Sequence, residues 1–204
     1  MTRAPQWTSF VFQDWKANAV GGLSARGALI TYRLGHLLYR SDLPGPLAVP
    51  LRALYHLLSI VFFRVLGPGL IEPLARIGPG IVLLHGVDCV YVHKNARLGA
   101  DVTLYQEVTI GENAPDGTSA APAVGSGVVV YAGAKIIGDV TIGEDAVIGA
   151  NAVVFRDIPA GATAVGNPAQ VVKVDPTGQT ARAERAQRTA SQSHPRMSDP
   201  GRTA

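Results

Sequence analysis

Aliphatic residues recur every six positions from Ile77 to Val154, and that spacing constrains the fold more than any other feature. Neither an α-helix nor a hairpin repeats every six residues, whereas a parallel β-helix with one short strand and one turn per unit does. Three such units close one triangular coil, so the spacing predicts a prism of stacked strands. The ladder positions are Ile77, Leu83, Val92, Leu98, Leu104, Ile110, Val124, Val130, Ile136, Ile142, Ile148 and Val154.

The residues that follow the ladder positions differ between the faces of this prism. On one face every ladder residue is followed by glycine, which indicates a tight corner or a close approach of backbones. These glycines are Gly78, Gly99, Gly125 and Gly143. On the next face the following residues include Leu84, Tyr105 and Tyr131, and their size predicts that this face packs against something.

The six-residue spacing slips twice. Leu83 and Val92 lie nine positions apart, and Ile110 and Val124 lie fourteen apart. A solenoid admits insertions at its corners, where they project as loops, and loops on a rigid scaffold are frequent places for binding and chemistry. His85 begins the first slip, and histidine is a side chain well suited to general base catalysis near neutral pH.

Composition divides the chain into three zones. Residues 1–70 are predicted to be helical, and residues 71–174 form the predicted β-helix. Residues 175–204 hold almost no large apolar side chain and are predicted to be a disordered tail. The N-terminus lacks the basic and apolar regions of a signal peptide, and a single cysteine fits a reducing compartment, so a cytoplasmic protein is expected.

The helical zone carries its own patterns. Arg26, Arg33 and Arg40 recur every seven residues, which places them on the polar side of a helix that runs to about Arg40. The apolar run Leu57–Phe63 is too short to span a bilayer, so we expect it to pack in an oligomer rather than contact a membrane. The net charge of +3 comes without a basic stripe, which argues against a nucleic-acid partner.

Several motifs together resemble the serine acetyltransferases, most closely a branch linked to exopolysaccharide clusters. The more specific ones are the slip at His85-Gly86 and the ending Gly166-Asn167-Pro168-Ala169. The resemblance implies a left-handed β-helix, a homotrimer or a dimer of trimers, and direct transfer of an acetyl group from acetyl-CoA to the hydroxyl of a small molecule. The other matching segments are residues 13–18, 80–84, 103–111 and 133–138.

The resemblance implies a role for one residue, and the positions and types of other residues suggest further roles. His85 matches the catalytic base of the family, Gln106 occupies the equivalent slot of the next coil, and Glu72 is a carboxylate that could orient His85. Small side chains and cations in the later coils would accommodate CoA, and no metal site is expected. The expected CoA-binding residues are Gly133, Ala134, Lys135, Ala150, Arg156 and Lys173.

Spacing alone leaves alternatives open. By itself it favours a structural corner histidine at His85, and only the family motif favours catalysis. His93 either lines the same cleft or is solvated. Lys135, Arg156 and Lys173 fit phosphate groups and fit solvated surface charges equally well.

The sequence departs from the family pattern where the acceptor would bind. Leu84 stands where the family has an aspartate, and residues 120–122 read Ala-Ala-Pro where a family loop reads Arg-His-Pro and grips the serine carboxylate. L-serine as acceptor is therefore in doubt, and a saccharide or polysaccharide hydroxyl, which needs no such cation, is the alternative. Two readings from other classes are a non-catalytic hexapeptide scaffold and a three-histidine zinc site, although the β-helix holds only two histidines.

Overall fold

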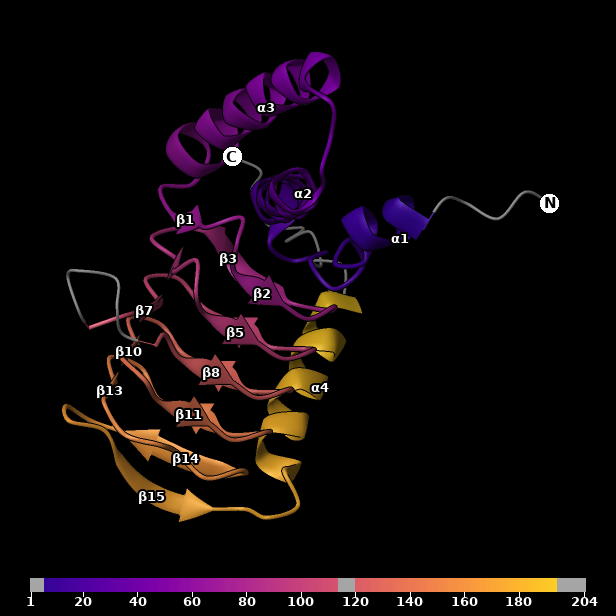
Figure 1. Ribbon diagram of the computed structural model, residues 1–204. Coiled ribbons are helices and arrows are strands. Elements are labelled where there is room, and N and C mark those ends of the chain that lie inside the picture. The colour runs from indigo at the N-terminus through magenta and orange to yellow at the C-terminus, as the bar shows by residue number, and fades with distance from the viewer. Residues whose placement is uncertain (1–5, 114–119, 194–204) are drawn as a thin grey trace, which may run out of the picture.

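The computed structural model describes residues 6–113 and 120–193. Its N-terminal part is helical, and these helices lie over the first coil of a β-helix (Figure 1). A π-helical segment, η1 (Val61–Val65), directly follows the third helix. The three preceding helices are α1 (Gln6–Phe12), α2 (Gly22–Arg40) and α3 (Gly45–Ile60).

Three sheets form the walls of a prism, in which each strand pairs in parallel with the strand one coil further on. Sheet A consists of β1 (Leu70–Ile71), β4 (Tyr91–Val92), β7 (Thr109–Gly111), β10 (Lys135–Ile137) and β13 (Val153–Val154). Sheet B consists of β2 (Arg76–Ile77), β5 (Arg97–Leu98), β8 (Ala123–Val124) and β11 (Thr141–Ile142). Sheet C consists of β3 (Val82–Val87), β6 (Thr103–Leu104), β9 (Val129–Val130), β12 (Val147–Ile148), β14 (Ala162–Val165) and the antiparallel β15 (Gln170–Val174).

The six-residue ladder is the core of this prism. Every ladder residue lies in a strand, and the most exposed of them, Ile77, is only 7 % exposed. Ladder residues of successive coils are direct partners in the register, as Leu83 is with Leu104. The predicted β-helix is therefore confirmed, with one further unit ahead of the first ladder position at Ile71. The left-handed sense of the coil stays a prediction.

The glycine-rich face is sheet B. At each of the four stacked glycines, an added Cβ would lie only 2.3–2.7 Å from a backbone atom of the next coil. No side chain fits at that distance, so the close backbone approach predicted from the sequence is confirmed. Along this row, the backbone of each coil therefore packs directly against the backbone of the next.

A buried ion pair ties the helices to the first coil. Asp14 and Arg33 are 2 % and 1 % exposed, and Arg33 Nε donates to Asp14 Oδ2 at 2.9 Å. The other guanidinium nitrogens donate to the carbonyl oxygens of Ile77 (2.6 Å) and Gly78 (2.7 Å). Because Ile77 belongs to the edge strand of sheet B, its carbonyl has no further strand to pair with. The prediction that Arg33 lies on the polar side of α2 is therefore wrong.

Helix α3 with η1 exposes a long apolar face. The two segments span 21 residues, Gly45–Val65, and their most apolar stretch of 18 residues has a mean hydropathy of 1.6 with only 17 % of its residues buried. The apolar helix is therefore longer than the run Leu57–Phe63 suggested. By length and composition alone it is long enough to cross a membrane. Its exposed apolar side chains include Leu47, Val49, Leu54, Leu57 and Ile60.

The segment after the prism differs from the predicted disordered tail. Helix α4 (Gln179–Ser193) runs beside the coils (Figure 1). Its Ala181 is fully buried against Val129 and Val147 of sheet C, so the face with large side chains does pack against another element.

Ion pairs complete the docking of α4. Arg185 Nη2 pairs with Asp145 Oδ1 at 2.9 Å, and Arg182 Nη2 pairs with Asp145 Oδ2 at 3.2 Å. Buried Ala181 and two arginines therefore help to hold a helix that has almost no large apolar side chain, which is why its composition predicted disorder. The remainder of the predicted tail, residues 194–204, lies outside the described residues.

Candidate active site

Corners of successive coils line up where sheet C passes into sheet A. We call this the His85 edge and define it by His85, Gln106, Gly133 and Ala150, one from each coil. Hydrogen bonds between corners hold it together, since Gly133 N–H donates to the Gln106 carbonyl at 3.0 Å. The predicted base and several of the predicted CoA-binding residues therefore share one edge of the prism.

His85 lies within β3, and its side chain is exposed. Its imidazole ring is 5.9 Å from the ring of Tyr105, centroid to centroid, and Tyr105 in turn stacks on Tyr131 at 4.8 Å. These two tyrosines follow ladder residues of sheet C, so each coil adds one ring to the row. The aromatic row gives His85 a wall on one side and leaves its ring open to a substrate.

Gln106 supplies an acceptor atom on the same edge. It occupies the slot two residues after Leu104, as His85 does after Leu83, and those two leucines are partners in the register. Its Oε1 atom is buried and has no hydrogen-bond partner in the described structure. Buried polar atoms are almost always paired, so this atom points to a donor supplied by a ligand or by a ring nitrogen.

The predicted CoA-binding residues divide between two parts of the prism. Gly133 adopts φ +75°, which favours glycine, and a Cβ there would lie 2.0 Å from Asn151 Oδ1. Ala134 is fully buried next to it, and the Lys135 Nζ donates to the carbonyl of Glu107. Ala150 is exposed at the same edge.

The other two predicted cations lie elsewhere. Arg156 is exposed and follows β13, so it lies where sheet A ends rather than where it begins. Lys173 lies on β15, and its Nζ donates to Thr180 Oγ1 at 3.2 Å. A single chain therefore does not bring either cation to the His85 edge.

Glu72 also lies away from His85. It lines a hollow of about 240 Å³ on sheet A together with His93 and Glu112. These three residues follow β1, β4 and β7 respectively, so they lie at the end of the strands of sheet A, whereas the His85 edge lies at their start. Within one chain, the structure separates the predicted base from the carboxylate predicted to orient it.

The hollow contains a histidine–carboxylate pair that the sequence did not reveal. His93 Nε2 lies 3.3 Å from Glu112 Oε1, and Asn95 N–H donates to His93 Nδ1 at 3.3 Å. A proton on Nε2 would therefore face the Glu112 carboxylate. The other oxygen of that carboxylate, Oε2, is buried without a described partner. Glu112 begins the second slip of the ladder, which is the only sequence signal that could have singled it out.

In the described part of the chain, no group of three His, Cys, Asp or Glu residues is placed to hold a metal ion.

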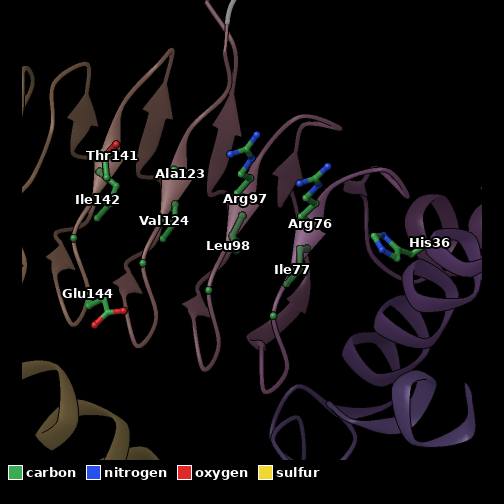
Figure 2. A pocket seen from close by; sticks show the side chains of 14 residues that line it. His36, Arg76, Ile77, Arg97, Leu98, Ala123, Val124, Thr141, Ile142 and Glu144 are labelled. Carbon is green, nitrogen blue, oxygen red and sulfur yellow. The ribbon is translucent and has the colours of Figure 1, made fainter. Parts of the chain in front are cut away.

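A larger hollow, of about 580 Å³, lies on sheet B and contains neither His85 nor Glu72 (Figure 2). The residues of the expected acetyl-transfer site are therefore divided between the two edges of sheet A.

Comparison with known proteins identifies the family. The family model for the bacterial transferase hexapeptide (six repeats) matches residues 122–156. A serine acetyltransferase of Helicobacter pylori is 38 % identical over 148 residues, which cover 72 % of this chain and 81 % of that protein. The chain belongs to the serine acetyltransferase family. The expectation of an acyltransferase is thereby confirmed at the level of the family.

Other family members show the extent of the similarity. A serine acetyltransferase of Synechococcus elongatus is 40 % identical over 73 % of this chain, but the chain spans only 59 % of that protein. The structure of soybean serine acetyltransferase complexed with serine has a TM-score of 0.69 at 34 % identity, covering 83 % of this chain and 70 % of that one. A serine acetyltransferase in complex with CoA has a TM-score of 0.59 at 35 % identity, covering 74 % and 57 %. The closer similarity to the exopolysaccharide-linked branch stays a prediction.

Proposed function

We propose that this protein transfers an acetyl group from acetyl-CoA directly to an acceptor hydroxyl, with His85 as the general base. The observation that carries the proposal is the order of residues along the His85 edge. Its successive coils carry an exposed imidazole at His85, an unpaired amide oxygen at Gln106 and a glycine corner at Gly133. His85 would take the hydroxyl proton as the oxygen attacks the thioester carbonyl. The thiolate then leaves, and no covalent acyl-enzyme is required.

The CoA complex of a family member supports acetyl-CoA as the donor. In this chain the corner at Gly133 brings bare backbone to the surface beside buried Ala134, which suits the narrow pantetheine arm. Lys135 adds a cation to the same corner. The protein is expected to act in the cytoplasm, as predicted from its composition.

We propose further that a complete site forms between two copies in a homotrimer or a dimer of trimers. His85 and Glu72 lie at opposite edges of sheet A, so in one chain Glu72 has no described contact with His85. A ring of identical prisms would set the His85 edge of one copy against the Glu72 hollow of the next. The exposed apolar face of α3 supports self-association.

Mixing two inactive variants tests this arrangement. His85→Ala and Glu72→Gln, each expressed alone, should be nearly inactive. Co-expressed in equal amounts, they should recover about a quarter of the parent activity, because random assembly places intact His85 opposite intact Glu72 at about one interface in four. No recovery in confirmed mixed oligomers would refute a site shared between copies, and full activity of Glu72→Gln alone would show that Glu72 has no role in it.

The chemical identity of the acceptor is a separate question, with L-serine and a saccharide hydroxyl as the two candidates. The names of the relatives, and the soybean complex with serine, favour L-serine. One observation favours a saccharide hydroxyl instead: the sequence from Gly111 to Pro122 contains no Lys, Arg or His to pair with an amino-acid carboxylate. A lost charge-assisted contact of this kind costs roughly 1.5–3 kcal/mol, or about ten- to a hundredfold in binding.

If L-serine is the acceptor, it should therefore saturate the enzyme weakly, and a neutral polyol or sugar should compete. The double variant Leu84→Asp/Ala120→Arg should raise kcat/KM for serine about tenfold or more by restoring both charges. Leu84→Asn/Ala120→Gln is the matched neutral control and should leave it unchanged. CoA release measured against a panel of amino acids and sugars checks this; tight saturation of the parent by serine would refute it.

A further inference from the structure

A groove of about 580 Å³ lies on the outer wall of sheet B (Figure 2). It crosses β2, β5, β8 and β11, so it runs along the axis of the prism. The row of stacked glycines lies along it, and these glycines are partly exposed. This groove is separate from the His85 edge and from the Glu72 hollow, so the acetyl-transfer site does not account for it.

Charge is distributed unevenly along this groove. Arg76 and Arg97 lie on neighbouring strands at one end, with His36 of α2 beyond them, while Glu144 lies at the other end (Figure 2). Burial, followed by the nearby Arg40 and Arg33, lowers the pKa of His36, although its Nδ1 donates to the Pro73 carbonyl at 2.9 Å. His36 is therefore neutral near pH 7, and the positive charge of the groove resides on two guanidinium groups.

The two arginines are placed so that they repel each other. Arg76 and Arg97 are direct partners in the parallel register of β2 and β5, where strands lie about 4.8 Å apart. Like charges in such positions destabilise a sheet. Neither guanidinium has a hydrogen bond or an ion pair within residues 6–113 and 120–193, and both side chains are exposed. A pair of unneutralised cations over an open groove is the arrangement that an anion would stabilise.

The kind of anion follows from the geometry of the donors. Guanidinium groups bind phosphate through paired N–H donors, and two of them side by side match a phosphate monoester or a diphosphate better than a single carboxylate. Beyond the arginines, the outward-facing positions of the groove carry the small side chains Ala123 and Thr141 beside the glycine backbone, which suit an extended, largely uncharged arm.

We propose that the sheet B groove binds a phosphate-bearing small molecule, with its phosphate on Arg76 and Arg97 and its arm along the glycine row towards β11. This site is independent of the proposed acetyl transfer. The carboxylate of Glu144 at the far end would keep the phosphate at the arginine end.

Calorimetric titration of the full chain at low ionic strength tests the proposal with two probes, sodium pyrophosphate and ADP. Both should bind, and Arg76→Gln/Arg97→Gln should raise each Kd about tenfold or more. Arg52→Gln/Arg64→Gln removes the same charge from exposed positions on α3 and η1 and should leave both Kd values unchanged. Ala123→Phe, in the middle of the groove, should weaken ADP but not pyrophosphate.

Melting temperature serves as the folding control. The double arginine variant should melt no lower than the parent, because it relieves a like-charge contact. Absence of saturable binding by the parent would overturn the proposal, as would equal losses in the two double variants, since binding would then reflect surface charge alone. Self-association that depends on Arg76 and Arg97 without any phosphate binding would also overturn it and make this wall an interface between copies.

Discussion

Replacing His85 by alanine is expected to lower kcat about 10²–10⁴-fold while leaving the affinity for acetyl-CoA nearly unchanged. The reason is that a general base acts mainly in the transition state, whereas the donor binds through other groups. The exposed position of His85 means that the substitution opens no cavity, so the melting temperature should stay that of the parent. Steady-state kinetics with a thiol reagent for released CoA, together with calorimetry of CoA binding, measure both quantities.

His93→Ala is the matched control, because it removes the other imidazole of the β-helix. His93 Nε2 lies 3.3 Å from Glu112 Oε1, and His93 is not the proposed base, so its loss should cost much less in kcat. Equal losses in the two variants, or an unchanged rate in His85→Ala, would show that His85 is not the base.

Replacing Asp14 by alanine is expected to reduce the free energy of unfolding by about 3–5 kcal/mol. The substitution leaves the guanidinium of Arg33, which is 1 % exposed, without its counter-charge. It also removes the acceptor of the Gly80 N–H, which donates to Asp14 Oδ1 at 2.8 Å. Urea denaturation followed by circular dichroism gives the midpoint and the slope from which this free energy is obtained.

Asp42→Ala is the control, because it removes an exposed carboxylate between α2 and α3. Its effect should stay within about 0.5 kcal/mol. A loss for Asp14→Ala no larger than that of the control would show that the carbonyls of Ile77 and Gly78 alone stabilise the buried guanidinium.

The fold was largely predictable because it repeats. In a strand, side chains alternate between faces, so a period of six residues with one strand per unit determines which residues point inward, and every ladder residue is indeed buried. The stacking of the four glycines was predictable for the same reason, because each follows a ladder residue at the same position of the repeat. Arg33 was not, because its spacing from Arg26 and Arg40 describes a helix in isolation. Its partners are Asp14 and two carbonyls at the open end of the prism, and local periodicity carries no information about them.

The sequence by itself determined the β-helix, the slip at His85 and the row of small residues that follows it along one edge. Only the tertiary structure decided that Glu72 and His93 lie at the opposite edge, that Glu112 joins them, and that Arg76 and Arg97 stand side by side over an open groove. The physical reason is that spacing along a chain specifies the direction of a side chain within its own coil. Which corners come to lie on the same edge depends on how many residues each insertion adds and on how the coils stack around the core.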